Sequence, residues 1–378
     1  MKKILLLCLA FPLVDAQAEV LLTNENSDYA VKFAGHIKLD LIADLDGHRD
    51  KYQFLMSAIP VEGDADYNSG GYFSMHSKES RFSFDVSKEI NGSDSKVYLE
   101  MDFFDEKNTA PRLRHFYFER GEFLVGQTWT NVSNLEAINI WIDFGAGDAL
   151  YGNRKMQVRW QRDINESLQF AASIEEPSDT NIENTLGIDG TEKAKLPIFS
   201  SRLIYRHDRG HLFFAGEAQQ LYWQGANTVD NDDAFGWSMT FSGSYRVFEQ
   251  DQIKWIFAQG SGTSKGVIAL AGAPTAASLD SNGKIQTDSF TNVTTSYTHV
   301  LNSQLNTSIG FTWLDVNPSE ARDPNTNIKE AIIGHANLLY HYDEDIEMGI
   351  EYMWGTRINI NDNEGNNRRL QAMVKYKF

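Results

Sequence analysis

Apolar and polar residues alternate along much of this chain, in segments of about ten residues that are separated by turn residues. In one such segment the apolar positions are Leu305, Thr307, Ile309, Phe311 and Trp313, and the polar positions between them are Asn306, Ser308, Gly310 and Thr312. Successive side chains of a β-strand point to opposite faces, so each segment predicts a strand with one apolar and one polar face. The repeated pattern predicts a transmembrane β-barrel.

Sixteen segments show this alternation, and an even number is what a single-chain bacterial barrel requires. They cover residues 31–43, 79–89, 95–105, 112–119, 122–128, 154–163, 167–175, 199–207, 210–222, 234–247, 252–261, 289–300, 303–315, 330–343, 346–357 and 367–378. The connections between them alternate between short turns and long loops. With both chain ends on the periplasmic side, every short turn is periplasmic and every long loop is external. The predicted fold class is an all-β, sixteen-stranded antiparallel transmembrane barrel in the bacterial outer membrane.

The two ends of the chain fit export and barrel assembly. Residues 1–18 have the features of a secretory signal peptide: Lys2 and Lys3 are basic, residues 4–14 are apolar, and Ala16-Gln17-Ala18 suits cleavage. Residues 19–378 contain no Pro-rich or Ser-rich linker and are predicted to form one barrel domain. The last segment ends on Phe378, and a terminal aromatic residue on an alternating strand resembles the assembly signal of bacterial outer-membrane proteins. An ordinary amphipathic edge strand is the alternative, but it would leave a sheet edge exposed.

Composition narrows the class of partner. The chain has 52 acidic and 34 basic side chains and a formal net charge of −18, which argues against a nucleic-acid partner. The net charge does not set the sign of a pore, because acidic residues can gather on external loops while a constriction is basic. The only cysteine, Cys8, lies in the predicted signal peptide, so the mature protein is expected to have no disulfide.

A barrel of sixteen strands is too wide for side chains to fill, so an aqueous channel is expected. The third external loop, residues 129–153, is the predicted narrowing device that folds into the lumen. Apolar side chains that would pack it inward are Trp129, Trp141, Phe144 and Leu150. The loop also carries the carboxylates Glu136, Asp143 and Asp148, which are expected to create a transverse field opposite basic residues.

Basic residues recur on the polar faces of the predicted strands. They are Lys38, Arg81, Arg112, Arg114, Arg159 and Arg202. An arginine on the lipid side of a barrel costs about 2–4 kcal/mol at the midplane, so these side chains are expected to face the lumen. The alternative for each one is a wall charge paired with a neighbouring carboxylate. As a group they predict a positive wall that favours small anions.

Three stretches of the first half of the chain carry a resemblance. They are Phe33-Ala34-Gly35-His36-Ile37-Lys38-Leu39-Asp40, Ser80-Arg81-Phe82-Ser83-Phe84-Asp85-Val86, and Arg112-Leu113-Arg114-His115-Phe116-Tyr117 followed by residues 123–131. Together they resemble the DcaP-like family of trimeric outer-membrane porins, with the specific match mainly in the first 160 residues. The resemblance implies a homotrimer, an arginine-rich eyelet and passage of small anions such as dicarboxylates. Residues 19–30 show no heptads, unlike family members with an N-terminal coiled-coil extension.

An enzyme or a metal-binding protein is the alternative to a passive channel. An outer-membrane barrel hydrolase of the phospholipase or protease type needs a nucleophile beside a histidine, but the histidines are scattered over different strands. His207 and His211 straddle a turn without a nearby third metal ligand. We therefore expect no enzyme activity, cofactor or metal. A general or cation-preferring porin remains the other alternative, and outer-membrane lipid and lipopolysaccharide are the expected surroundings.

Overall fold

The computed structural model describes residues 19–23, 29–90, 93–104, 110–148, 150–177, 181–270, 276–319 and 322–378. The predicted signal peptide, residues 1–18, lies outside the described residues. No helix in the described part of the chain is long and apolar enough to cross a membrane.

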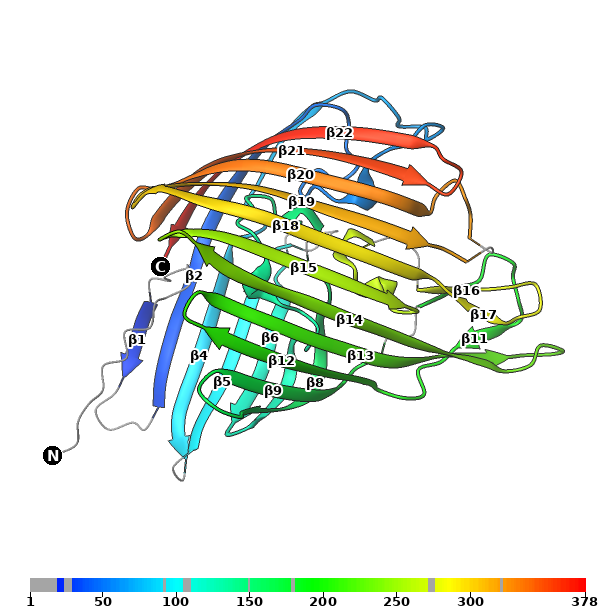
Figure 1. Ribbon diagram of the computed structural model, residues 1–378, viewed down its shortest axis with the longest axis horizontal. Helices are drawn as coiled ribbons and strands as arrows, with labels where there is room; N and C mark the ends of the chain where they lie inside the picture. Colours follow the sequence, from blue (N-terminus) through cyan, green and yellow to red (C-terminus); the bar gives the residue numbers. More distant parts are fainter. Residues whose placement is uncertain are drawn as a thin grey trace.

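Sixteen antiparallel strands form a closed barrel, as the sequence predicts (Figure 1). Each strand overlaps one predicted segment, and most observed bounds lie within three residues of the predicted ones. The strands are β2 (Tyr29–Asp44), β4 (Arg81–Ile90), β5 (Ser93–Asp102), β6 (Arg112–Arg120), β7 (Phe123–Trp129), β8 (Arg154–Asp163), β9 (Leu168–Glu175), β12 (Ile198–His207), β13 (Gly210–Gly225), β14 (Asp232–Val247), β15 (Asp251–Ser261), β18 (Ser289–Asn302), β19 (Leu305–Asn317), β20 (Ile328–His341), β21 (Ile346–Asn359) and β22 (Glu364–Lys377).

The barrel closes where the first long strand meets the last. Residues 36–44 of β2 pair with β22, and the backbone N–H groups of Gly35 and Phe378 each donate to the other residue's carbonyl oxygen, at 2.9 and 3.0 Å. A Cβ atom on Gly35 would lie 2.3 Å from the Arg81 carbonyl oxygen, so this close approach requires glycine. Strand β1 (Glu19–Thr23) pairs with residues 30–34 of β2, just beyond the end of β22. The C-terminal aromatic residue therefore lies at the closing seam.

Turns and loops are sorted to opposite ends of the barrel. The C-terminus and the described short hairpin turns lie at one end, and the long loops lie at the other (Figure 1). The long loops contain short elements that alternation does not predict: β3 (Tyr72–His76), β10 (Ile182–Glu183), β11 (Gly190–Glu192), β16 (Ala277–Leu279), β17 (Ile285–Thr287) and the 3-10 helices η1 (Met56–Ala58), η2 (Leu135–Ala137), η3 (Ala146–Asp148), η4 (Ser264–Gly266) and η5 (Ile268–Leu270). Strands β10, β16 and β17 form a separate small sheet over the external end.

Each barrel strand has an outer face that suits contact with lipid and an inner face that points into the barrel. On β19, Ile309 and Phe311 are 44% and 39% exposed on the outer face, whereas the neighbouring Ser308 and Thr312 are buried on the inner face. The outer face therefore offers apolar side chains to lipid. This pattern and the closed barrel place the protein in the outer membrane.

Part of the inner wall is apolar and is covered by loops that fold into the barrel. We call residues 45–71 loop L1, residues 130–153 loop L3, residues 176–197 loop L4 and residues 262–288 loop L6. One buried cluster joins Phe54 and Met56 of L1, Val132 and Tyr151 of L3 and Val267 of L6 to wall residues such as Phe213, Phe290, Leu314, Ile333 and Met353. The sequence predicted an inward fold only for L3, whereas L1 and L6 also contribute to the packing inside the barrel.

Candidate functional site

Loop L3 follows the inner wall of the barrel from strand to strand. Near its start, Asn131 Nδ2 donates to Ser173 Oγ on β9 at 2.7 Å. Asn134 Nδ2 then donates to Ser242 Oγ on β14 at 2.9 Å. The Ile138 carbonyl oxygen accepts from Lys254 Nζ on β15 at 2.8 Å. These contacts attach the first part of the loop to three separate strands.

The second part of L3 continues around the same wall. Asn337 Nδ2 on β20 donates to the Ile140 carbonyl oxygen at 2.6 Å. On β21, Glu351 Oε1 accepts from the backbone N–H groups of Ile142 and Asp143 at 3.1 and 3.0 Å. Lys38 Nζ on β2 donates to the Ile142 carbonyl oxygen at 2.6 Å. Because these partners come from strands around the barrel, L3 is a fixed lining of the lumen.

The predicted acidic and aromatic residues of L3 have different surroundings. Glu136 forms two hydrogen bonds of 2.7 Å with the Arg206 guanidinium and is partly exposed. Trp141 packs against the apolar cluster, over Gly147. The Asp143 carboxylate is buried and accepts from the Phe54 and Gly145 backbone N–H groups, and burial raises the pKa of this carboxyl. The side chain of Asp148 lies outside the described part of the structure. Of the two L3 carboxylates whose side chains the structure describes, Glu136 is the one that reaches water.

Three predicted arginines lie together on the inner face of β4 and β6. Arg114 donates from Nε to Glu100 and from Nη1 to Asp102, both at 2.7 Å. Arg112 makes two further hydrogen bonds to Asp102, at 2.9 and 2.7 Å. Arg81 Nη1 lies 3.5 Å from Glu100 Oε1. Three guanidinium groups therefore share two carboxylates of β5.

A fourth arginine, Arg154, belongs to the same group. It interacts electrostatically with Arg81, Arg112, Arg114 and Asp102, although it lies on β8. Its guanidinium lies 4.7 Å from the centre of the Trp129 ring and forms no salt bridge with a described residue. We call Arg81, Arg112, Arg114 and Arg154 the arginine cluster. Sequence reasoning did not select Arg154 as a site residue. Its position as a basic residue at the start of a predicted strand, directly after L3, was the feature that could have identified it. Trp129, expected to pack L3 inward, instead ends β7 beneath this guanidinium.

The other predicted cations lie apart from this cluster. Lys38 is buried under L3, where it contacts Asp40 at 3.2 Å and also binds Glu79. Arg159 donates to Gln157 Oε1 at 3.0 Å and to the Trp129 carbonyl oxygen. Arg202 donates to Gln161 Oε1 at 3.5 Å and interacts electrostatically with Arg159. Neither Arg159 nor Arg202 forms a salt bridge with any residue that the structure describes.

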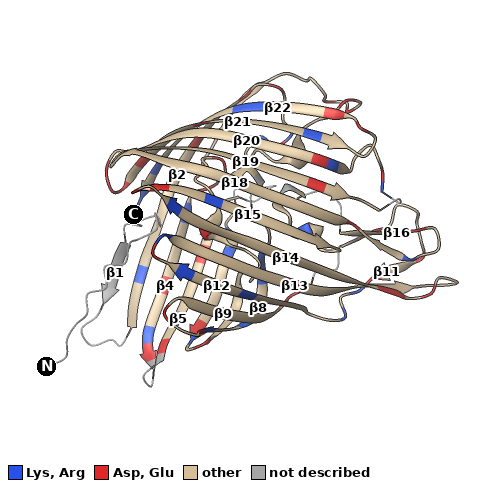
Figure 2. Ribbon diagram, in the orientation of Figure 1, with Lys and Arg blue, Asp and Glu red and all other residues tan. Residues whose placement is uncertain are grey.

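Basic and acidic positions are interspersed over β2 and the wall from β4 to β9 (Figure 2). Two of the histidines weighed as catalytic candidates bind loop L3: His211 Nε2 lies 2.9 Å from Asn134 Nδ2, and His335 Nε2 lies 2.8 Å from Asn139 Nδ2. The described residues contain no group of three or more His, Cys, Asp or Glu side chains placed to hold a metal ion. The cations of the lumen are therefore the main chemical feature of the candidate site.

A closed sixteen-stranded barrel with a loop fixed along its inner wall defines an outer-membrane channel of the porin class. The family model described as DcaP outer membrane protein matches residues 22–378. The chain belongs to this family, and the match covers the whole barrel instead of mainly its first 160 residues. None of the proteins with a curated description matches the chain.

Solved structures agree on the fold. The outer membrane channel DcaP of Acinetobacter baumannii has a TM-score of 0.81 at 18% sequence identity, covering 94% of this chain and 99% of that chain. OmpF of Salmonella typhi has a TM-score of 0.59 at 9% identity, covering 95% of this chain and 100% of that chain. A trimer form of OmpT of Vibrio cholerae has a TM-score of 0.56 at 13% identity, covering 93% of this chain and 100% of that chain. At these identities the likeness concerns the fold.

Proposed function

We propose that this protein lets small polar solutes diffuse passively across the outer membrane and prefers anions, including dicarboxylates. One observation carries the proposal: the salt bridges of the four-membered arginine cluster involve two carboxylates, Glu100 and Asp102, and a third carboxylate, Glu79, interacts electrostatically with Arg81. The next carboxylate along the wall, Glu79, is bound to Lys38. The cluster therefore has a surplus of positive charge that a passing anion can balance.

The physics of a narrow lumen supports an anion preference. Water-filled passages with protein walls focus the field of fixed charges, so an excess of arginine raises the local concentration of anions and lowers that of cations. Arg159 and Arg202 extend the basic lining. Their guanidinium groups interact electrostatically with each other, and neither group forms a salt bridge with a described residue. Glu119 interacts electrostatically with both arginines and offsets part of their positive charge.

The test is the reversal potential of Arg154→Gln in a potassium chloride gradient across a planar bilayer. Arg154 is the better choice than Arg112 or Arg114, because it forms no salt bridge with a described residue, so its removal leaves no carboxylate unpaired. A unit charge about 6 Å from an ion in water attracts an anion and repels a cation by about 0.7 kcal/mol each, so removing the charge changes the anion-to-cation permeability ratio by about 1.4 kcal/mol, a factor of about ten.

The matched control is Arg162→Gln, which removes an arginine that is 63% exposed and pairs with Glu122 near a short turn. We expect the control to keep the wild-type anion-to-cation permeability ratio and Arg154→Gln to lower this ratio about tenfold. Equal ratios for the two variants would contradict the proposal. A wild-type channel that prefers cations would favour the alternative of a general or cation-preferring porin.

We also propose that the protein is a homotrimer. Strands β7 and β9 have 7 and 8 residues, whereas β13 and β14 have 16 each. A tilted strand needs about 9–11 residues to cross the hydrocarbon core, so a wall with such short strands suits contact with another protomer better than contact with lipid. A structural neighbour exists in a trimer form, which supports the same assembly. The mass of the protein in detergent, measured by light scattering, would be that of one chain if the proposal is wrong.

Export to the outer membrane implies removal of a signal peptide and contact of the barrel with lipid. We propose that residues 1–18 are removed on export, that residues 19–378 form the mature barrel domain, and that the outer face meets lipid and lipopolysaccharide. N-terminal sequencing of the protein from outer membranes should begin at Glu19. A mature protein that starts elsewhere would contradict the predicted cleavage site.

A further inference from the structure

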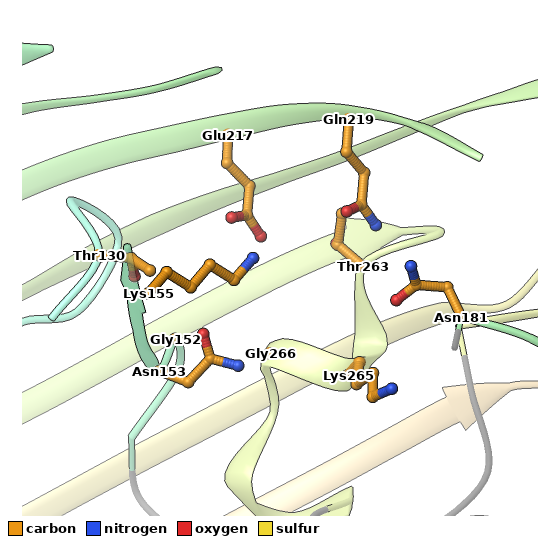
Figure 3. Close-up of a pocket in the computed structure, with 10 residues that line it drawn as sticks. All are labelled: Thr130, Gly152, Asn153, Lys155, Asn181, Glu217, Gln219, Thr263, Lys265 and Gly266. Carbon is orange, nitrogen blue, oxygen red and sulfur yellow. The ribbon is translucent and has the colours of Figure 1, made fainter. Parts of the chain in front are cut away.

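A pocket lies in the external half of the lumen, between the ends of L3, L4 and L6 and the middle of β13 (Figure 3). Its empty volume is about 450 Å³, including the open mouth. The lining residues are Thr130, Gly152, Asn153, Lys155, Asn181, Glu217, Gln219, Thr263, Lys265 and Gly266. The arginine cluster is not part of this lining, so the pocket is a separate feature of the channel.

Glu217 presents a fixed carboxylate to the pocket. Its Oε1 atom accepts from the Tyr151 hydroxyl at 2.5 Å and from Ser238 Oγ at 3.2 Å. Tyr151 is itself buried, and its backbone forms a bridge to Val267 of L6. These contacts fix the orientation of the carboxylate. The described residues donate no hydrogen bond to Oε2, so this atom is available to a ligand.

Lys155 presents an ammonium group on the opposite side. It extends from β8 across the pocket toward Glu217 (Figure 3). The two groups interact electrostatically, yet they form no salt bridge with each other, and the Lys155 ammonium group has no hydrogen-bond partner among the described residues. An ammonium and a carboxylate are therefore held near each other with open volume beside them and the amides of Asn153 and Gln219 around them.

We infer that this pocket binds a short carboxylic acid that also carries a hydrogen-bond donor, either a hydroxyl or an ammonium group. The ligand's carboxylate would pair with Lys155 Nζ, and its donor group would bond to Glu217 Oε2, since charge-assisted hydrogen bonds are the stronger kind. A plain dicarboxylate offers Glu217 only another negative charge, which is repelled. The inference rests on the proposed passage of anions and adds a choice among them.

The experiment compares malate, aspartate and succinate as blockers of the current through single wild-type channels in a planar bilayer. The three acids have the same carbon chain, and they differ in carrying a hydroxyl group, an ammonium group or neither. We expect malate and aspartate to block at about tenfold lower concentration than succinate, because one charge-assisted hydrogen bond distinguishes them. If only malate or only aspartate has the advantage, the identity of the donor is settled and the inference holds.

Two variants test the assigned roles. Glu217→Gln keeps an oxygen for the Tyr151 hydroxyl and removes the charge, and it should abolish the advantage over succinate. Lys155→Met should raise the blocking concentration of all three acids by about tenfold. Lys329→Met is the control, because Lys329 is exposed on β20 and pairs with Asp362 outside the pocket. Heat-dependent mobility in detergent gels verifies that each variant is folded.

The outcomes separate this inference from the proposed function. Equal block by all three acids in a wild-type channel that still prefers chloride would overturn the pocket assignment and leave the proposed function standing. A wild-type channel that prefers potassium would overturn the proposed function. An advantage of malate or aspartate that survives Glu217→Gln would also overturn the pocket assignment.

Discussion

The anchoring of loop L3 by Glu351 gives a quantitative prediction. Glu351 lies on the inner face of β21, and its Oε1 atom accepts from the backbone N–H groups of Ile142 and Asp143. Its Oε2 atom accepts from Asn337 Nδ2 at 2.9 Å, and Asn337 in turn donates to the Ile140 carbonyl oxygen. Replacing Glu351 by alanine leaves the two backbone groups without their acceptor and frees the amide that holds Ile140.

The size of the effect follows from the unpaired groups. A buried N–H group without a partner costs about 1–3 kcal/mol, so two of them weaken the docking of L3 by about 2–6 kcal/mol. The lower figure corresponds to a roughly 30-fold rise in the population of the undocked loop. Glu351→Gln keeps one acceptor oxygen and should lie between alanine and the wild type.

Hydrogen exchange of residues 134–143 and the variance of the single-channel current are the readouts. Both should rise in Glu351→Ala, because an undocked loop exchanges faster and moves within the lumen. Glu347→Ala is the control: Glu347 lies on the same strand and contacts Lys375 at 2.9 Å and His341 at 3.4 Å, but not L3. The same exchange rates in Glu351→Ala as in Glu347→Ala would refute the claim that Glu351 holds the loop.

Two further predictions concern the loops inside the barrel. His48 of L1 accepts the Asp50 backbone N–H at Nδ1 and donates from Nε2 to the Leu55 carbonyl oxygen, and burial lowers its pKa to about 4. The docking of L1 should therefore be fully stable above the usual histidine pKa of about 6.5 and should weaken as pH falls toward about 4. The measurement is hydrogen exchange of residues 45–59, corrected for the intrinsic rate, which should become faster at low pH. His48→Gln should remove this pH dependence, and a pH dependence that persists in the variant would contradict the assignment. Gly147 has a φ of 58°, and a Cβ atom there would lie 2.1 Å from the Trp141 ring. Gly147→Ala should weaken L3 docking by about 1–3 kcal/mol in the same exchange measurement, and an unchanged rate would show that the loop conformation does not need glycine.

Alternation along the sequence predicts the barrel well because the cause is local. Each strand has one face toward lipid and one toward the lumen, so residues such as Ile309 and Ser308 are sorted by their own chemistry. Loop lengths then orient the barrel. Alternation does not single out Glu217 in the same way, because its face of β13 also carries the buried apolar residues Phe213, Leu221 and Trp223.

The arrangement of charges depends on contacts between distant parts of the chain, which alternation does not report. The pairing of Arg112 with Asp102 requires the register of the β5–β6 hairpin, which contains a shift at Glu100 and Met101. The burial of Lys38 requires that L3 crosses above it, which is a consequence of loop packing. For this reason the sequence identified basic lumen positions but not which of them have carboxylate partners.

The most direct test of the proposed function is the reversal potential of the wild-type protein in a potassium chloride gradient across a planar bilayer. The surplus of positive charge in the arginine cluster predicts a potential shifted toward that of chloride, with stable conductance steps because L3 is fixed to the wall. A potential close to that of potassium, or a folded protein without conductance steps, would contradict it.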